Sequence, residues 1–123
     1  MVRRKALFDT NILIDYLSGI PQARLEMERY SQRAISIITW MEVMAGTTPQ
    51  NESVARAFLQ TFDLLQIEAK IAERAVLIRK TRRIKLPDAV IWATAEVHQC
   101  LLVTRNTRDF DPNEPGVRVP YTL

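Results

Sequence analysis

Short apolar runs that stop abruptly at a polar or acidic residue most constrain what this chain can fold into. The first run, 6–8, ends at Asp9 and passes directly into the periodic segment 12–17. A short apolar run followed by helical periodicity predicts a buried strand that leads into a helix. In an open α/β sheet, ligands bind in the crevice at the carboxyl ends of the strands. We therefore expect Asp9 at the edge of the sheet where a site would form.

The same alternation continues along the chain and predicts an α/β protein with a mostly parallel central sheet of four or five strands flanked by helices. Further strands are expected over 34–38, 64–67, 101–103 and 117–119, and further helices over 22–30, 51–62, 69–83 and 88–98. At 123 residues the chain is long enough for one core and too short for two. We therefore expect a single domain that spans residues 1–123.

Composition excludes several classes of protein. Apolar residues make up 47% and charged residues 25% of the chain, which is typical of a folded globular protein. Cys100 is the single cysteine, so neither an internal disulfide nor a cysteine-rich zinc site can form. No apolar run approaches the roughly 20 residues of a membrane span, and no signal-peptide pattern precedes the first strand, so we expect a cytoplasmic protein with no membrane partner. The formal charge of +3 is compatible with a polyanionic partner but does not require one.

Each acidic residue near a predicted strand end has an ordinary structural explanation. Asp9 can form an Asx turn or cap the helix that follows it. Thr39 and Glu42 have the spacing of a capping box, in which each side chain bonds a backbone N–H of the other residue. Asp88 lies in the first turn of a predicted helix, where the helix dipole favours an acid. Asp109 can be a turn residue at the end of a strand.

The joint placement of these acids favours a function. Three of them follow apolar strands, and Asp88 opens the helix that leads into the last of these strands, so a parallel sheet can bring all four to one edge. Ionised carboxylates a few ångström apart repel strongly, and a divalent cation removes that penalty. Oxygen ligands without nearby His or Cys suit Mg²⁺ or Mn²⁺. Such a site can activate a water, which predicts hydrolysis of phosphodiester bonds.

Four stretches of the chain resemble the motifs of PIN domains, in particular those of VapC-type toxins from bacterial and archaeal toxin–antitoxin pairs. The stretches are 7–11, 39–42, 86–95 and 102–110. They follow the order of the family and span nearly the whole chain. The Asp-Thr-Asn sequence in the first stretch is weakly specific alone. Together with the Thr-x-Asn-x-x-Asp-Phe pattern in the last stretch, it identifies the family with good specificity.

The resemblance implies Mg²⁺-dependent endoribonuclease activity in a homodimer, with a cognate antitoxin that inserts a segment to block the site. It implies that the catalytic, metal-binding acids are Asp9, Glu42, Asp88 and Asp109. Thr104 would orient an acid or a metal-bound water, and Thr10, Asn11 and Asn106 would line the same pocket. The chain departs from the family at 98–100, where members often carry Gly shortly before the last core strand and this sequence has His-Gln-Cys.

A basic stretch over 79–85 runs directly into Asp88 and has two interpretations. It can be a solvated helix end whose cations complement the helix dipole. Alternatively, it can hold RNA phosphates beside the metal. The candidate phosphate-binding cations are Arg82, Arg83, Lys85, Arg105 and Arg108.

Other functions stay open from the sequence. A phosphatase or phospho-acceptor protein also uses strand-end acids with Mg²⁺, but it needs a second acid beside the first, where this chain has Thr10 and Asn11. It also usually needs a lysine at a late strand end, and none follows the strand expected at 101–103. A non-catalytic RNA- or protein-binding module on the same fold predicts lost acids, and none is lost. A housekeeping PIN nuclease is the remaining alternative.

Overall fold

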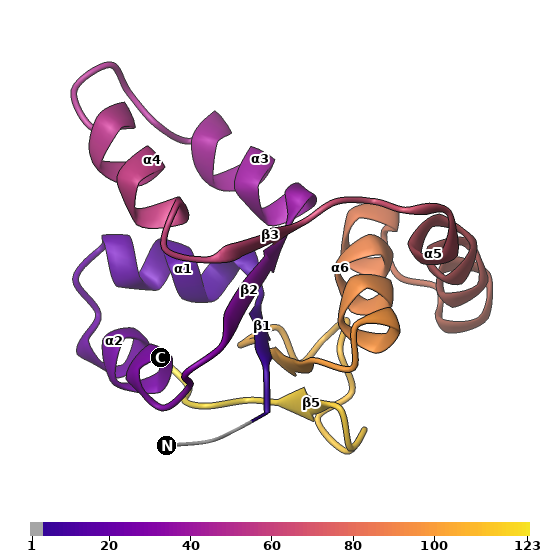
Figure 1. The fold of residues 1–123 in the computed structure, drawn as a ribbon. Helices are drawn as coiled ribbons and strands as arrows, with labels where there is room; N and C mark the ends of the chain where they lie inside the picture. Colours follow the sequence, from indigo (N-terminus) through magenta and orange to yellow (C-terminus); the bar gives the residue numbers. More distant parts are fainter. Residues whose placement is uncertain (1–3) are drawn as a thin grey trace.

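The computed structural model describes residues 4–123 and contains one parallel sheet (Figure 1). Five strands follow the order β3-β2-β1-β4-β5, and every neighbouring pair is parallel. The strands are β1 (Ala6–Phe8), β2 (Arg33–Ser36), β3 (Asp63–Leu65), β4 (Leu101–Val103) and β5 (Val117–Arg118). The α/β class and the parallel sheet expected from the sequence are confirmed.

Six helices flank the sheet in the described part of the chain. They are α1 (Thr10–Leu17), α2 (Pro21–Glu28), α3 (Ile37–Ala45), α4 (Glu52–Leu59), α5 (Ala69–Arg82) and α6 (Leu86–Val97). α5 and α6 cover one face of the sheet, while α1, α2 and α4 lie on the opposite side (Figure 1). Among the described residues, no helix is long and apolar enough to cross a membrane.

The central strands are buried on both faces, which explains their continuous apolar runs. In register, Leu7 of β1 lies between Ala34 of β2 and Leu102 of β4. These three side chains face α5 and α6, whereas Phe8 and Val103 face the core on the other side. Successive strand residues point to opposite faces, so one run supplies both cores. The polar residues that follow each run are left at the carboxyl edge of the sheet.

The second strand ends earlier than the sequence predicted, and the expected capping box is wrong. β2 stops at Ser36, whose hydroxyl oxygen accepts the Ile38 N–H at 3.1 Å and caps α3. Thr39 therefore lies inside the helix, fully buried, and does not pair with Glu42 as a cap. The β-branched residues Ile37 and Ile38 favoured a longer strand by propensity, but the side-chain cap starts the helix before them.

The turn between α6 and β4 keeps the geometry for which family members often use Gly. Gln99 has a left-handed φ of 56° there. Its N–H donates to the Glu96 carbonyl at 3.2 Å, and the Cys100 N–H donates to the Ala95 carbonyl at 2.8 Å. These two bonds form a Schellman motif, which ends a helix with a left-handed residue. The departure from the family pattern at 98–100 therefore leaves the path into β4 intact.

Candidate active site

Four carboxylates occupy the carboxyl edge of the sheet, as the strand ends predicted. Asp9 follows β1 and caps α1, Glu42 projects from α3, Asp88 lies in the first turn of α6, and Asp109 follows β4. The charges of the other three acids all raise the pKa of Asp88. Groups that shift one another in this way lie within electrostatic reach, so the fold brings the four acids to one place.

The pKa of Asp88 shows that holding four carboxylates close together disfavours the ionised form. Its pKa rises from an ordinary value of 3.8 to about 7. Burial is the largest cause, followed by the charge of Asp9, the hydrogen bond and charge of Asp109, and the charge of Glu42. A perturbed acid surrounded by other acids is typical of a functional site and is costly for a purely structural helix start. Within residues 4–123, no group of three or more Asp, Glu, His or Cys side chains is already arranged to hold a metal ion.

Asp9 is buried and held by three donors. Its Oδ1 accepts the Thr10 N–H at 2.7 Å, which is the helix cap expected as the structural explanation. Its Oδ2 accepts the Thr104 hydroxyl at 2.7 Å and the Asn11 side-chain amide at 3.1 Å. Burial raises the pKa of Asp9, and these hydrogen bonds offset only part of that effect. The cap uses one oxygen of Asp9, and the other oxygen belongs to the site.

Thr104 and Asn11 orient Asp9 through defined hydrogen bonds. The Thr104 hydroxyl oxygen accepts the Asn106 N–H at 2.9 Å and donates its proton to Asp9. Asn11 accepts the Arg105 N–H at 3.2 Å on its Oδ1, which turns its amide NH₂ toward Asp9. The structure thus places the side chains of Thr104 and Asn11 beside Asp9. It places Asn106 beside them through its backbone.

Glu42 is exposed and is held by a chain of hydroxyl groups. The Thr10 hydroxyl donates to Glu42 Oε1 at 2.7 Å, and its oxygen lies 3.0 Å from the Thr39 hydroxyl. One hydroxyl carries one proton and a carboxylate only accepts, so Thr39 donates to Thr10 and Thr10 donates to Glu42. This role of Thr39 could not be predicted from the sequence, because the contact joins two helices that follow different strands.

Asp109 sits in a compact turn. The Asn106 side chain donates to Asp109 Oδ2 at 3.0 Å, and the Asp109 N–H donates to Asn106 Oδ1 at 3.2 Å. The next residue, Phe110, is fully buried and packs edge-on against Trp92 with ring centres 5.3 Å apart. The turn expected at Asp109 is present. It fixes the backbone while leaving the carboxylate in reach of Asp88.

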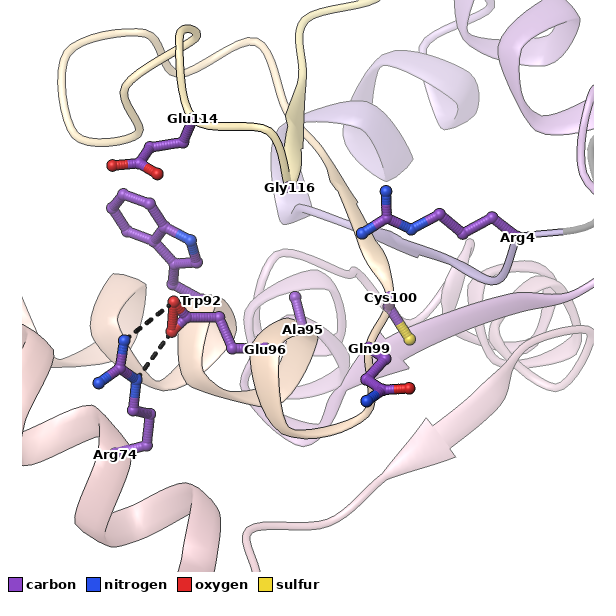
Figure 2. Close-up of a pocket in the computed structure, with 9 residues that line it drawn as sticks. All are labelled: Arg4, Arg74, Trp92, Ala95, Glu96, Gln99, Cys100, Glu114 and Gly116. Atoms are coloured by element: carbon purple, nitrogen blue, oxygen red, sulfur yellow. Dashed lines mark hydrogen bonds and ion pairs between the residues drawn. The ribbon is translucent and has the colours of Figure 1, made fainter.

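Arg82 is engaged inside the protein. Its guanidinium carbon lies 4.1 Å from the ring centre of Trp92, and its Nη2 lies 3.4 Å from Glu96. Arg74 holds the same carboxylate with two hydrogen bonds of 2.8 and 3.1 Å (Figure 2). Glu96 and Trp92 also line a cavity of about 650 Å³ that none of the four acids lines. Arg82 therefore joins α5 to α6.

Arg105 is likewise paired, since two of its guanidinium nitrogens donate to the buried carboxylate of Asp15 at 2.6 and 2.9 Å. The other three candidate cations, Arg83, Lys85 and Arg108, are exposed. Arg108 and Asp109 line one cavity of about 400 Å³. Of the cations predicted to meet RNA, these three have side chains open to solvent.

Comparison with known proteins agrees with the motifs. The pattern of the PIN domain family matches residues 6–112. The "tRNA(fMet)-specific endonuclease VapC" of Shigella flexneri is 30% identical over 119 aligned positions, which cover 87% of this chain and 90% of that protein. "Ribonuclease VapC19" of Mycobacterium tuberculosis is 32% identical over 127 aligned positions, which cover 94% of this chain and 98% of that protein.

A solved structure agrees as well. A chain in the "Toxin-antitoxin complex from Klebsiella pneumoniae" superimposes with a TM-score of 0.91 and 50% identity, over 96% of this chain and 99% of that one. The present chain belongs to the PIN domain family. The relatives that resemble it within that family are VapC ribonucleases and the chains of toxin–antitoxin complexes.

Proposed function

We propose that this protein is the toxin of a toxin–antitoxin pair and acts as a Mg²⁺-dependent endoribonuclease. The observation that carries the proposal is the placement of four acids at the carboxyl edge of the sheet, after β1 and β4 and on α3 and α6. The raised pKa of Asp88, caused first by burial and then by the charges of the other three acids, supports it. The proposed metal-binding and catalytic acids are Asp9, Glu42, Asp88 and Asp109. The names of the VapC relatives support cleavage of RNA as the reaction.

The donor set fits a hard divalent cation. It offers carboxylate oxygens and no sulfur or imidazole, which suits Mg²⁺ and, with similar preferences, Mn²⁺. Burial and, after it, repulsion by the other acids raise the pKa of Asp88 to about 7, and a bound cation offsets that repulsion. When bound, the ion supplies Lewis acidity and a water of lowered pKa for attack on phosphorus.

The surrounding residues hold the acids in place. Thr104 donates to Asp9, and Thr10 donates to Glu42. Asn106 bonds Asp109 through both ends of its amide. Each bond restricts the direction in which a carboxylate points, and such outer contacts tune ligand groups in metal sites. In this proposal the polar residues of the two motifs therefore act by orienting the acids.

The exposed cations beside the site are proposed to hold the RNA backbone. Arg83 and Lys85 precede Asp88, and Arg108 precedes Asp109, so each cation is close in sequence to a proposed metal ligand. Lys and Arg side chains that neutralise phosphates give most of the sequence-independent affinity for nucleic acids.

An apolar groove beside Glu42 supports an antitoxin as the partner. The groove has a volume of about 310 Å³ and runs between α1, α3 and α4. Three of its large apolar side chains are exposed, with Ile14 at 47%, Leu17 at 38% and Val54 at 64%. An apolar helix can lie in such a groove, and an Arg on it can bond a carboxylate with two hydrogen bonds while competing with Mg²⁺. The proposal also includes a homodimer, on the family resemblance alone.

Expression in a bacterial host tests the toxin assignment. The chain expressed alone is expected to arrest growth, the Asp9→Asn variant is expected to be harmless, and co-expression of a protein encoded beside it is expected to restore growth. Harmless expression of the folded wild-type chain would contradict a toxin and favour a housekeeping PIN nuclease.

A further inference from the structure

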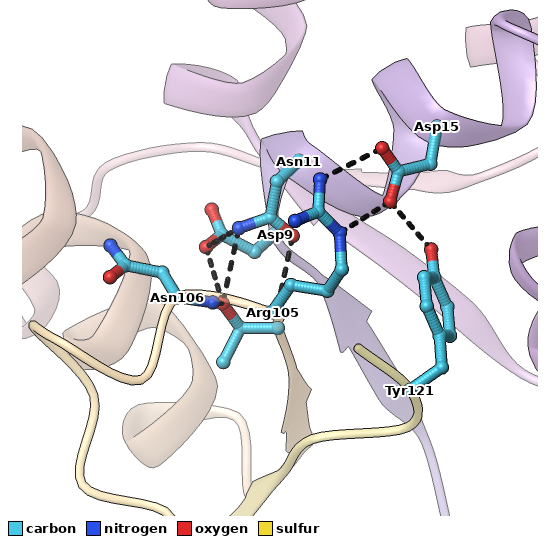
Figure 3. A network of polar contacts seen from close by, with 7 residues as sticks. Asp9, Asn11, Asp15, Arg105, Asn106 and Tyr121 are labelled. Carbon is cyan, nitrogen blue, oxygen red and sulfur yellow. Dashed lines mark hydrogen bonds and ion pairs between the residues drawn. The ribbon is translucent and has the colours of Figure 1, made fainter. Parts of the chain in front are cut away.

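A hydrogen-bond network reaches Asp9 from the far end of α1 and from the segment after β5 (Figure 3). Its centre is Asp15, which is only 6% exposed. Asp15 accepts two bonds from Arg105 at 2.6 and 2.9 Å and one from the Tyr121 hydroxyl at 2.8 Å. Burial raises the pKa of Asp15, but these bonds outweigh burial and hold the pKa below its ordinary value. The centre of the network is thus an ionised carboxylate.

The network continues into the site through the backbone of Arg105. Its N–H donates to Asn11 Oδ1 at 3.2 Å, and the Asn11 amide donates to Asp9 Oδ2 at 3.1 Å. Because Oδ1 is taken by Arg105, the NH₂ end of Asn11 faces Asp9. Arg105 also directly follows Thr104, the other side-chain donor to that oxygen. Both side-chain donors to Asp9 Oδ2 thus depend on where Arg105 is held.

We infer that Asp15 is a positioning residue, which holds Arg105 so that Asn11 and Thr104 keep Asp9 in its reactive orientation. The inference rests on the ribonuclease activity proposed above. It assigns Arg105 to the support of the site and removes it from the candidate phosphate-binding cations. A bidentate pair between Arg and a carboxylate is geometrically specific, which suits it to fix a loop. Tyr121 adds the segment after β5 to this support.

A second network in the same protein offers a matched control. Glu26 is 4% exposed and accepts two bonds from Arg118 at 2.6 and 3.0 Å and one from the Tyr30 hydroxyl at 2.8 Å. It therefore repeats the chemistry of Asp15, with a buried carboxylate, a bidentate Arg and a Tyr. It joins α2 to β5, and among the described residues none of its three side chains bonds a residue of the candidate site. The Arg118 carbonyl accepts the Thr104 N–H at 3.0 Å, but this bond belongs to the backbone pairing of β4 with β5, in which the Arg118 side chain takes no part.

The experiment compares Asp15→Asn with Glu26→Gln in the purified full chain. Both variants neutralise a buried carboxylate and are expected to lower the melting temperature. Only Asp15→Asn is expected to lower kcat for RNA cleavage, by about 10- to 100-fold, as for other residues that orient metal ligands. Its KM and the salt dependence of RNA binding are expected to stay unchanged. If Asp15→Asn does not fold, Tyr121→Phe and Tyr30→Phe form the same comparison with one hydroxyl removed from each.

Two outcomes would overturn the inference. Equal kcat values for Asp15→Asn and Glu26→Gln would mean that Asp15 only stabilises the fold. A raised KM with a flatter salt dependence of RNA binding in Asp15→Asn would mean that Arg105 contacts phosphate. An inactive wild type would refute the proposed function instead. The NMR signal of the Asn11 side-chain amide then decides whether Asp15 positions the site, since it is expected to shift in Asp15→Asn and not in Glu26→Gln.

Discussion

The Thr104 hydroxyl donates a 2.7 Å hydrogen bond to the buried carboxylate of Asp9, across 95 residues of sequence. This bond joins the carboxyl ends of β1 and β4, which are neighbours in the sheet. It ties the Asp-Thr-Asn motif near the start of the chain to the Thr-x-Asn-x-x-Asp-Phe motif near its end. The parallel order of the strands is what brings the two together.

Replacing Thr104 by Val removes the donor while keeping the shape of the side chain. Because Thr104 is fully buried and bonds a charged group, Thr104→Val is expected to lower the free energy of unfolding by about 1–3 kcal/mol. It is also expected to reduce RNA cleavage by at least about tenfold. Thr104→Ser keeps the hydroxyl and is the control. Wild-type cleavage in Thr104→Val, measured with purified protein, would show that the bond has no role in the reaction.

Asp88 predicts how the stability of the metal-free protein depends on pH. Its pKa is about 7 in the folded protein and 3.8 ordinarily, so between these values the folded state binds more protons than the unfolded state. The contribution of Asp88 to the free energy of unfolding therefore falls as pH rises from about 4 to about 7. Asp88→Asn removes this contribution and is expected to melt at a higher temperature than the wild type at pH 8.

Thermal unfolding in EDTA at pH 5 and at pH 8 checks this prediction. The increase in melting temperature caused by Asp88→Asn is expected to be larger at pH 8, where the wild-type carboxyl is ionised among the other acids. An equal increase in melting temperature at both pH values would mean that the charge of Asp88 does not cause the increase.

The exposed cations predict a change in salt dependence. Replacing Arg83, Lys85 and Arg108 together by Gln is expected to weaken RNA binding and to reduce the salt slope by roughly one counterion for each lost phosphate contact. Fluorescence anisotropy in EDTA, which prevents metal-dependent cleavage, measures both quantities. Arg24→Gln, an exposed change on α2, is the control. An unchanged salt slope in the triple variant would mean that these cations are solvated side chains at a helix end and in a turn, without contact to RNA phosphates.

The groove predicts a variant that escapes its antitoxin. Val54 is 64% exposed and lines the groove, so Val54→Asp is expected to leave the fold and RNA cleavage intact. A charge in an apolar contact is expected to weaken antitoxin binding by at least about tenfold. Leu25→Asp, on α2 and outside the groove, is the matched control with 57% exposure. Equal affinity of both variants for the antitoxin, in a titration with the purified partner, would place the partner elsewhere.

The acids of the site could be predicted from the sequence because each one has a fixed position relative to a strand end or a helix start. Asp9 and Asp109 follow apolar runs, and parallel strands place such residues at one edge. That inference needs only local patterns and one rule of topology. The boundary after β2 was missed because Ile37 and Ile38 have the propensity of a strand, while the helix cap at Ser36 decides the structure.

The residues that hold the acids in place could not be predicted in the same way. Asp15 and Tyr121 meet Arg105 over separations of 90 or more residues, and nothing in the local sequence reports such a contact. From the sequence, Arg105 was one candidate for contact with RNA phosphates, because a cation beside a strand end is available for phosphate unless a carboxylate pairs with it. The packing of α1 against the loop after β4 shows that the carboxylate of Asp15 pairs with Arg105.

Cleavage of RNA by the purified protein tests the central claim most directly. The wild type is expected to cleave in Mg²⁺ and to stop in EDTA. Asp9→Asn, Asp88→Asn and Asp109→Asn are each expected to fold, since Asn keeps the size of the side chain, and to lose activity, since the charge is removed. Glu73→Gln on the exposed surface of α5 is expected to keep full activity. Cleavage at the full rate in EDTA, or in all three acid variants, would contradict a metal-dependent nuclease built on these carboxylates.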